Sequence, residues 1–254
     1  MNPPKSWSKP VLRSLFISDL HLTPGRPDIT RAFLRFLEQD APQAQQLFIL
    51  GDFFEYWVGD DLMDDFHHQI ASALKALSEK GVHLFFMHGN RDFLVGKRFC
   101  QLAGCTLLTD PTVIQLADKP VLLMHGDSLC TSDTSYMRYR RIIQNPLIKR
   151  LLIHLPSQFR INTAKRLREN SKANSGRKPL AIMDVTQKAV ISEMARHHVD
   201  TLIHGHTHRA AIHDLDNNKQ RIVLGDWDIL GWVLSHDDEQ SKNNGFQLTS
   251  FTIK

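Results

Sequence analysis

Seven side chains with the donor atoms of divalent metal sites follow short apolar runs in this chain of 254 residues. They are carboxylates, imidazoles and one carboxamide: Asp19, His21, Asp52, Asn90, His125, His206 and His208. Such oxygen and nitrogen donors suit transition metals, and a set without thiolates argues against a structural zinc knot. Seven donors are too many for one ion, so we expect two, with Asp52, in the middle of the series, as the bridging carboxylate. Two metal ions about 3.5–4 Å apart clamp the attacking and the leaving oxygen in displacement at phosphorus.

The apolar runs before these residues predict buried β-strands. The runs are 15–18, 47–50, 82–87, 121–124 and 201–203. Open α/β sheets place their ligands at the carboxyl ends of the strands, so we expect the polar residues to meet at one edge. Taken singly, each of them is more often a helix cap, a turn residue or a hydrogen-bonded core group than a ligand. Five such strand ends in order are not explained in that way.

The rest of the chain alternates strands with amphipathic helices and then adds antiparallel strands. This pattern predicts the α/β class, with two mixed β-sheets sandwiched between helices. We expect helices over 29–37, 66–80, 93–103 and 184–197. We expect a hairpin over 113–124 and closing strands over 221–225, 231–235 and 246–253. Residues 11–254 would form a single domain.

The segment 131–178 breaks the alternation of strands and helices. Between Arg138 and Lys178 it has twelve Lys or Arg and one acid, Glu169, although the net charge of the whole chain is only +4. We predict a helical insertion over 135–178 that covers the site. A basic segment can face nucleic acid, an anionic membrane surface or an anionic substrate. Alternatively, its apolar residues pack it onto the core and its charges are simply solvated.

The sequence contains no feature of a secreted or membrane-spanning chain. No window approaches the roughly 18 to 20 apolar residues that span a bilayer, and residues 1–10 lack the apolar stretch of a secretory signal. The three cysteines, Cys100, Cys105 and Cys130, form no C-x-x-C pair. They are typical of reduced thiols in a cytoplasmic protein, which is the location we expect.

The polar strand ends resemble, in order, the five sequence blocks of the calcineurin-like metallophosphoesterase family. The blocks are Asp19-x-His21, Gly51-Asp52, Gly89-Asn90-Arg91-Asp92, His125-Gly126-Asp127 and Gly205-His206-Thr207-His208. The resemblance implies a two-sheet sandwich flanked by helices, with one metal held by Asp19, His21, Asp52 and His208. It implies a second metal held by Asp52, Asn90, His125 and His206. We expect two Mn²⁺ ions, although the ligands also suit iron or zinc, and we expect His204 and Asp127 to orient ligands.

Arg91 stands where many members of this family have a histidine that protonates a poor leaving group. Arginine is not a general acid at neutral pH, because its pKa lies above roughly 12. It can bind phosphate oxygens in a bidentate manner. Charge stabilisation without proton donation suits a good leaving group, so this position favours cleavage of a phosphoanhydride over a phosphomonoester.

Longer stretches resemble one branch of the family, which hydrolyses the pyrophosphate bond of UDP-2,3-diacylglucosamine in lipid A biosynthesis. These stretches are 51–61, 89–94, 125–131 and 181–185. The resemblance implies water attack at the α-phosphorus, giving UMP and 2,3-diacylglucosamine 1-phosphate, with Asp52, Asn90, Arg91 and His125 as catalytic residues. It implies substrate contacts from Asn90, Arg91, Asp133, Ser171, Asn174, Lys178 and His206. A register shift of one residue would give the roles near 174–178 to Ser175 or Arg177.

The same resemblance implies a peripheral location on the cytoplasmic face of the inner membrane. The apolar residues of the insertion would line an acyl-chain cleft, and its basic residues would meet anionic head groups. A nucleic-acid phosphoesterase is the nearest alternative, but the insertion offers only Tyr136, Tyr139 and Phe159 for base stacking. A non-catalytic scaffold on a decayed fold would lack ligands, and all seven are present. We expect no nucleic-acid partner and no obligate protein partner.

Overall fold

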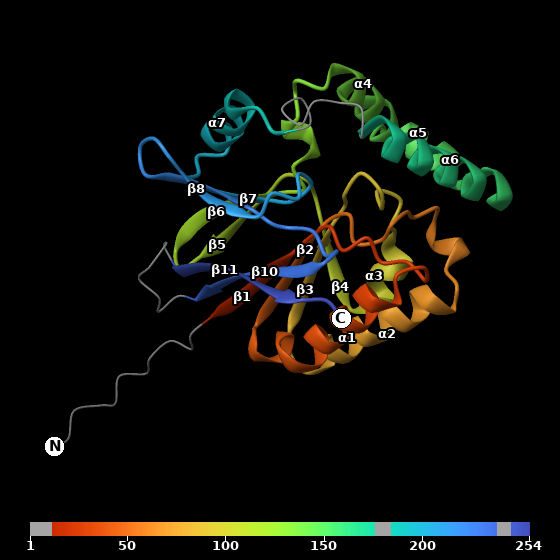
Figure 1. Ribbon diagram of the computed structural model, residues 1–254, viewed down its shortest axis with the longest axis horizontal. Coiled ribbons are helices and arrows are strands. Elements are labelled where there is room, and N and C mark those ends of the chain that lie inside the picture. Colours follow the sequence, from red (N-terminus) through yellow and green to blue (C-terminus); the bar gives the residue numbers. More distant parts are fainter. Residues whose placement is uncertain (1–11, 176–183, 238–244) are drawn as a thin grey trace.

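Two mixed β-sheets pack face to face, with helices on both outer faces, in the computed structural model of the protein (Figure 1). The structure describes residues 12–175, 184–237 and 245–254. This arrangement confirms the expected α/β fold class. Among the helices of the described residues, none has the length and apolar character needed to cross a membrane.

The first sheet has six strands in the order β11-β10-β1-β2-β3-β4. They are β1 (Arg13–Ile17), β2 (Gln46–Leu50), β3 (His83–Met87), β4 (Cys105–Leu108), β10 (Leu230–Asp237) and β11 (Phe246–Thr252). The strands β1 to β4 are parallel, and β10 and β11 extend the sheet in antiparallel fashion. Parallel β1, β2 and β3 therefore end at the same edge.

The second sheet has five strands in the order β5-β6-β7-β9-β8. They are β5 (Thr112–Leu116), β6 (Lys119–Met124), β7 (Thr201–His204), β8 (Ala211–Leu215) and β9 (Lys219–Val223). The neighbours β6, β7 and β9 are parallel, whereas β5 and β8 form hairpins with β6 and β9. The expected hairpin over 113–124 is the β5–β6 pair.

Alternate residues of the central strands point to opposite faces of the first sheet, as the pleat requires. Phe16, Phe48 and Phe85 are register neighbours on the inner face, and their rings stack with centroids 4.9 and 4.7 Å apart. They face the inner side chains of the second sheet in one apolar cluster. A strand that is buried on both faces must be apolar at every position, which is why these segments are continuous apolar runs.

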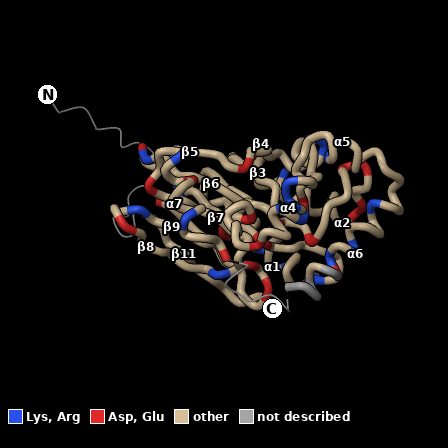
Figure 2. Tube along the Cα trace, turned by 90° about the horizontal axis from the view of Figure 1, so that it is seen from above, with Lys and Arg blue, Asp and Glu red and all other residues tan. Residues whose placement is uncertain are grey.

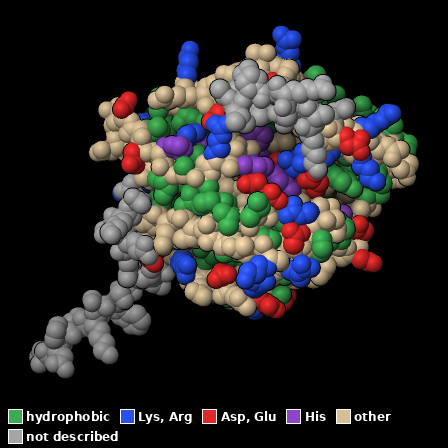
Figure 3. All heavy atoms as spheres, in the orientation of Figure 1, with side chains coloured by type: hydrophobic (Ala, Val, Ile, Leu, Met, Phe, Trp, Pro, Cys, Tyr) green, Lys and Arg blue, Asp and Glu red, His purple; other side chains and the backbone are tan. Residues whose placement is uncertain are grey.

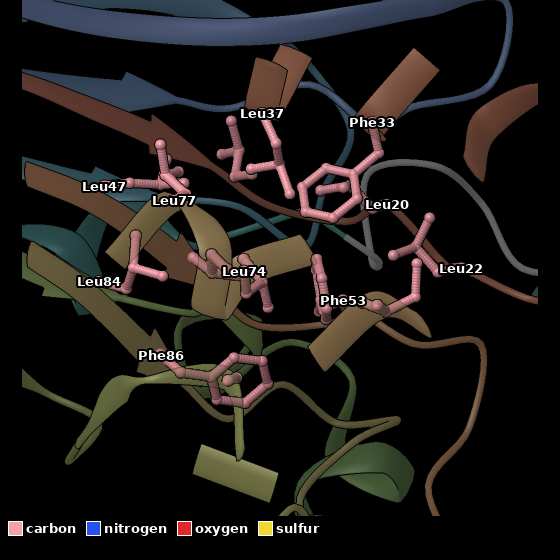
Figure 4. Packing of buried hydrophobic residues seen from close by; sticks show 14 of the residues in the cluster. Leu20, Leu22, Phe33, Leu37, Leu47, Phe53, Leu74, Leu77, Leu84 and Phe86 are labelled. Atoms are coloured by element: carbon pink, nitrogen blue, oxygen red, sulfur yellow. The ribbon is translucent and has the colours of Figure 1, made fainter. Parts of the chain in front are cut away.

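The outer face of the first sheet packs against α1 (Pro27–Gln39), α2 (Asp65–Glu79) and α3 (Lys97–Ala103). Figure 4 shows Leu74 and Leu77 of α2 beside Leu47 and Leu84 of the sheet. The helix α7 (Gln187–Arg196) covers the outer face of the second sheet. Short 3₁₀ helices lie at Ala41–Gln43, Asp60–Leu62 and Asp127–Leu129.

The segment after the second sheet's β6 forms three helices, α4 (Thr134–Ile143), α5 (Pro146–Ile153) and α6 (Ser157–Ser175). In Figure 1 they run along one end of the two sheets, and Figure 2 shows basic residues recurring along them. We call this segment, 134–175, the helical insertion. The last of its helices, α6, extends to Ser175.

Several element boundaries differ from the sequence prediction for local reasons. The helix α3 begins at Lys97 instead of position 93, because the carboxylate of Asp60, the first residue of a 3₁₀ helix distant in sequence, accepts hydrogen bonds from the N–H groups of Gly96 and Phe99. The helix α7 begins at Gln187 because Thr186 is its N-cap. The strands β4 and β8 were not predicted, since each lies at a sheet edge where its residues are only partly buried or exposed and do not form a continuous apolar run.

Candidate metal centre

The seven predicted metal ligands all lie just beyond the carboxyl ends of five parallel strands. Asp19, Asp52 and Asn90 follow the neighbouring strands β1, β2 and β3. His125 follows β6, and the pair of His206 and His208 follows β7, so both sheets contribute to the site. In Figure 3 histidine side chains gather with acidic ones near the centre of one face. The strand ends therefore meet as the sequence predicts.

One group of potential metal donors consists of Asp19, His21 and His208, whose donor atoms lie within 4.8 Å of one another. His208 Nε2 is 3.4 Å from His21 Nε2 and 3.4 Å from Asp19 Oδ1. The other ring nitrogen of His208 lies 3.3 Å from Asp226 Oδ2. Asp226 thus orients the imidazole of His208, as carboxylates commonly do for histidine ligands.

A second group consists of Asp52, His125 and His206, again with donor atoms within 4.8 Å. His125 Nε2 lies 3.7 Å from Asp52 Oδ1 and 3.1 Å from Asn90 Oδ1. The opposite ring nitrogen of His125 donates to the carbonyl of Leu50 at 2.9 Å, which leaves Nε2 as an acceptor for a metal. The donor set of each group matches what divalent transition metals bind.

The backbone at these residues is held in an unusual conformation. Five of the seven predicted ligands have positive φ angles: Asp19, His21, Asp52, His206 and His208, between 49° and 69°. Non-glycine residues rarely adopt this region, and it concentrates at functional sites where surrounding structure enforces it. The tight turns that bend each strand end toward the centre thus impose a conformational cost on the ligands themselves.

Two glycines allow the strand ends to approach one another. A Cβ atom on Gly89 would lie 2.2 Å from Asp52 Oδ1, and one on Gly205 would lie 2.3 Å from Asp19 Oδ2. Any side chain at either position would displace a candidate ligand. The Gly-Asn and Gly-His pairs of the sequence therefore serve a steric need.

A buried polar atom without a hydrogen-bond partner points into the first group. Asp19 Oδ2 accepts hydrogen bonds from Ser18 Oγ at 2.6 Å and from the N–H of His206 at 2.8 Å. Its second oxygen, Oδ1, faces His208 Nε2 at 3.4 Å and is among the buried atoms that make no hydrogen bond. Burying a carboxylate oxygen without a partner is costly, and a metal ion between these two residues would satisfy it. The residues present therefore fit a divalent metal.

Charge and burial shape the protonation of the imidazoles. Burial, together with His125, lowers the pKa of His206 to about 3, so this ring is neutral near pH 7. The pKa of His125 is raised to about 9: burial opposes its protonation, but the carboxylates of Asp52 and Asp19 outweigh it. A bound cation would take the place of that proton, because metal binding releases protons from ligands.

Glu55 lies at the candidate metal centre, although no role for it was predicted from the sequence. Its Oε2 accepts a hydrogen bond from Arg91 Nη1 at 2.7 Å, and its Oε1 accepts one from Arg168 of α6. It also lies 4.0 Å from His21 Nδ1. Glu55 belongs to the longer stretch 51–61 quoted for the resemblance, but nothing in the sequence shows that it joins the insertion to the site.

Asp92 fixes the turn after β3 to the turn after β2. It is fully buried, and its two oxygens accept hydrogen bonds from the N–H groups of Gly89 at 2.7 Å and Phe53 at 2.8 Å. Burial and the nearby Asp52 raise its pKa to about 7. Asp92 thereby places the backbone on either side of Asp52 and Asn90.

Asp127 and His204 were expected to orient ligands. Asp127 accepts hydrogen bonds from Tyr136 and Arg140 of α4, both at 2.7 Å, so it fastens the insertion to the core. The ring of Tyr136 in turn stacks on His206, with centroids 6.0 Å apart. His204 Nδ1 contacts the carbonyl of Gly205 at 2.9 Å, and its other nitrogen is buried without a hydrogen bond.

The predicted substrate contacts fall in three places. Asn90, Arg91 and His206 lie at the candidate metal centre. Asp133 is buried and caps α4 by accepting hydrogen bonds from the N–H of Tyr136 and from Ser135 Oγ. Ser171 is exposed on α6. The side chains of Asn174 and Ser175, and all of Arg177 and Lys178, lie outside the described residues.

An α/β sandwich with two adjacent His/Asp donor groups at its strand ends is the architecture of a metal-dependent phosphoesterase. The family model of the calcineurin-like phosphoesterases matches residues 12–210, and the chain belongs to this family. Two similar proteins are named UDP-2,3-diacylglucosamine hydrolase. That of Ectopseudomonas mendocina is 56% identical over 92% of this chain and 98% of the relative, and that of Stutzerimonas stutzeri is 54% identical over 94% and 99%. Among solved structures, a novel archaeal phosphodiesterase aligns with a TM-score of 0.48 and 12% identity over 94% of this chain and all of that one.

Proposed function

We propose that this protein hydrolyses the pyrophosphate bond of UDP-2,3-diacylglucosamine, giving UMP and 2,3-diacylglucosamine 1-phosphate for lipid A biosynthesis. The observation that carries the proposal is the likeness to the UDP-2,3-diacylglucosamine hydrolases, which spans the strand ends and the helical insertion alike. The two donor groups at the strand ends could hold the metal ions that such a hydrolysis uses. Phosphoanhydride hydrolysis is thus the reaction class.

The two donor groups would hold two divalent metal ions, and we propose Mn²⁺ as the metal. When bound, the ions supply positive charge that stabilises the attacking and leaving oxygens of a displacement at phosphorus. Asp19, His21 and His208 would hold one ion, and Asn90, His125 and His206 the other. We assign Asp52 as the carboxylate shared between them.

Asn90 and Arg91 would bind the oxygens of the phosphoryl group under attack. The guanidinium of Arg91 is held by Glu55 and lies 3.3 Å from Asp52 Oδ2, so its charge is fixed beside the candidate metals. A positioned cation of this kind stabilises the charge that develops in the transition state. Arg91 does not protonate the leaving group, and the leaving sugar phosphate needs no proton. We propose the α-phosphorus as the atom attacked.

The helical insertion would bind the acyl chains and the membrane surface. Seven of its large apolar side chains are exposed, and they are Tyr139, Ile142, Leu147, Leu151, Ile153, Phe159 and Leu167. This surface suits hydrocarbon chains, whereas packing onto the core accounts for Ile143, which is buried. We propose that the protein lies at the cytoplasmic face of the inner membrane as a peripheral protein.

Some basic residues of the insertion contact the protein core instead of facing outward. Arg160 is buried and pairs with Asp61, Arg168 pairs with Glu55, and the ammonium of Lys149 lies 5.6 Å from the ring centroid of Phe93. These three were among the residues expected to meet head groups, and the expectation is wrong for Arg160. Arg150, Lys165 and Arg166 are exposed and remain available for an anionic surface.

The alternative of a nucleic-acid phosphoesterase gains no support from the described part of the insertion. Tyr136, one of its three aromatic residues, is engaged by Asp127 and by the ring of His206. Only Tyr139 and Phe159 remain exposed for base stacking. This is a poor platform for a nucleic-acid strand.

Hydrolysis in ¹⁸O-labelled water tests the proposal. The Mn²⁺-loaded protein would be given UDP-2,3-diacylglucosamine and, in parallel, unacylated UDP-N-acetylglucosamine. We expect turnover of the acylated substrate alone, with the label in UMP, because attack occurs at the α-phosphorus. Label in the sugar phosphate would move the attack to the other phosphorus, and cleavage of nucleic acid without turnover of either nucleotide would refute the lipid substrate.

A further inference from the structure

A cavity opens beside the candidate metal centre. Its volume is about 370 Å³, within the range of pockets that bind small molecules. Its wall includes His208, a member of the first donor group, together with Arg209, His213, Arg221 and Trp232. The cavity is therefore continuous with the place where a phosphate would bind.

The cavity and the insertion reach the first donor group through different residues. Arg168 of α6 donates to Glu55, which lies 4.0 Å from His21 Nδ1. His21 Nε2 is 3.4 Å from His208 Nε2, and His208 forms part of the cavity wall. A substrate with two different halves joined through phosphate would place one half at the cavity and the other near Glu55 and Arg168.

The lining of the cavity combines polar side chains with the apolar Ala210, Ala211 and Val223, a mixture that suits a nucleotide. Asp184, Arg209, Arg221 and His213 are polar, in contrast to the exposed apolar surface of the insertion. Arg209 pairs with Asp184, so the wall offers a carboxylate acceptor next to guanidinium donors. Burial and the charge of Arg221 lower the pKa of His213, which keeps its imidazole neutral. Figure 3 shows histidine and basic side chains beside the central histidine cluster on the same face.

Trp232 supplies an aromatic ring in this polar wall. Its indole lies directly on the backbone of Gly225, where a Cβ atom would come within 2.3 Å of Trp232 Cδ1. The side chain is only partly buried and contributes to the cavity lining. A flat ring fixed by the backbone beneath it is a suitable platform for stacking a base.

We propose that this cavity is the nucleoside subsite, in which Trp232 stacks on the uracil ring and Arg221 binds a carbonyl oxygen of the base. This inference rests on the proposed function, since it assigns one half of that substrate. Uracil presents a carbonyl acceptor at the position where cytosine presents an amino donor, so a guanidinium donor favours uracil. The acylated sugar phosphate would extend toward Arg91 and the insertion.

The test is binding of the two products to the Mn²⁺-loaded full-length protein by calorimetry. Trp232→Leu and Arg221→Gln should each weaken UMP binding by about tenfold, the scale of one stacked base or one hydrogen-bonded edge. Binding of 2,3-diacylglucosamine 1-phosphate should stay as in the wild type. The control is Arg196→Gln, an exposed arginine on α7 that should change neither value.

Kinetics separate failure of this inference from failure of the proposed function. In Arg221→Gln the ratio of kcat/KM for UDP-2,3-diacylglucosamine over its cytidine analogue should fall toward one, whereas Trp232→Leu should leave this ratio unchanged, because stacking does not distinguish the bases. In both variants KM should rise more than kcat falls. A wild-type protein that hydrolyses the lipid substrate, with variants that bind UMP as tightly as it does, would overturn the subsite alone. Equal weakening of both products would also overturn it. Absence of hydrolysis by the wild type would reject the proposed function and this inference together.

Discussion

The guanidinium of Arg91 lies between two carboxylates: Nη1 donates to Glu55 Oε2 at 2.7 Å, and Nε is 3.3 Å from Asp52 Oδ2. Arg91 is thereby held rigidly at the candidate metal centre. Glu55 also binds Arg168 of α6, so the same carboxylate joins Arg91 to the helical insertion.

Replacing Arg91 by lysine should lower kcat/KM by about 10²-fold, because lysine keeps the charge but not the planar fork that fits phosphate oxygens. Metal content should stay unchanged, since Arg91 is in neither donor group. Glu55→Gln should reduce activity in the wild-type background but add little to Arg91→Lys, because Glu55 acts by placing Arg91. Fully additive effects in the double variant would contradict this role.

Each donor group should lose its own metal when one member is changed. His21→Gln removes a donor from the first group, and His206→Gln removes a donor from the second. Each variant should therefore retain about one of the two proposed metal ions. The measurement is elemental analysis after extensive dialysis. His83→Gln, at an exposed position on β3, is the control and should keep both ions. Two ions retained by either site variant would exclude that residue as a ligand.

The candidate ligands were predictable because their signal is local: each follows a run of apolar residues that must be a strand buried on both faces. The roles of Glu55 and Tyr136 were not predictable, because they arise from contacts with Arg91 and with His206 that are distant in sequence. The same reason explains the start of α3, which is set by Asp60, a residue far from it in sequence. Periodicity also failed for β4, whose partly buried residues carry no clear alternation.

Arg160 anchors the helical insertion to the core, and its removal should loosen that attachment. Its Nη1 donates to the carbonyl of Val58 at 2.6 Å and to Asp61 Oδ1 at 2.8 Å. Arg160→Met keeps the apolar stem but loses these bonds, which should cost about 1–3 kcal/mol in local stability. Hydrogen exchange along α6 should become faster, whereas Arg166→Met, exposed on the same helix, should leave it unchanged. Unchanged exchange in Arg160→Met would show that other contacts hold the insertion.

His67 should make the stability of the protein fall in weakly acidic solution. Burial against Phe54 and Trp57 lowers its pKa below the ordinary value of 6.5, although Asp64 partly opposes the shift. Below about pH 6.5 the unfolded chain therefore binds a proton that the folded protein refuses, so the free energy of unfolding decreases as the pH falls.

The comparison for His67 is between variants at several pH values. The stability advantage of the wild type over His67→Gln should be largest near pH 7 and shrink toward about pH 5, as measured by chemical denaturation. If the stability advantage of the wild type over His67→Gln grew as the pH fell, the folded state would favour the protonated ring.

The exposed apolar side chains of the insertion give the membrane proposal its sharpest test. Leu147 and Leu151 lie one turn apart on α5 and are 76% and 60% exposed. If they enter the acyl region of a membrane, replacing either with glutamine should weaken binding to anionic lipid vesicles by about tenfold, since a buried leucine contributes roughly 1.5–3 kcal/mol. The matched control is Leu102→Gln, because Leu102 is 41% exposed but lies on α3, outside the insertion. Equal loss of vesicle binding in all three variants would show that exposure alone matters and that the insertion does not face the membrane.

Hydrolysis of a detergent-dispersed substrate should separate the two roles of this surface. Loss of vesicle binding with KM retained would assign Leu147 and Leu151 to the membrane, whereas a raised KM would assign them to the acyl chains of the substrate.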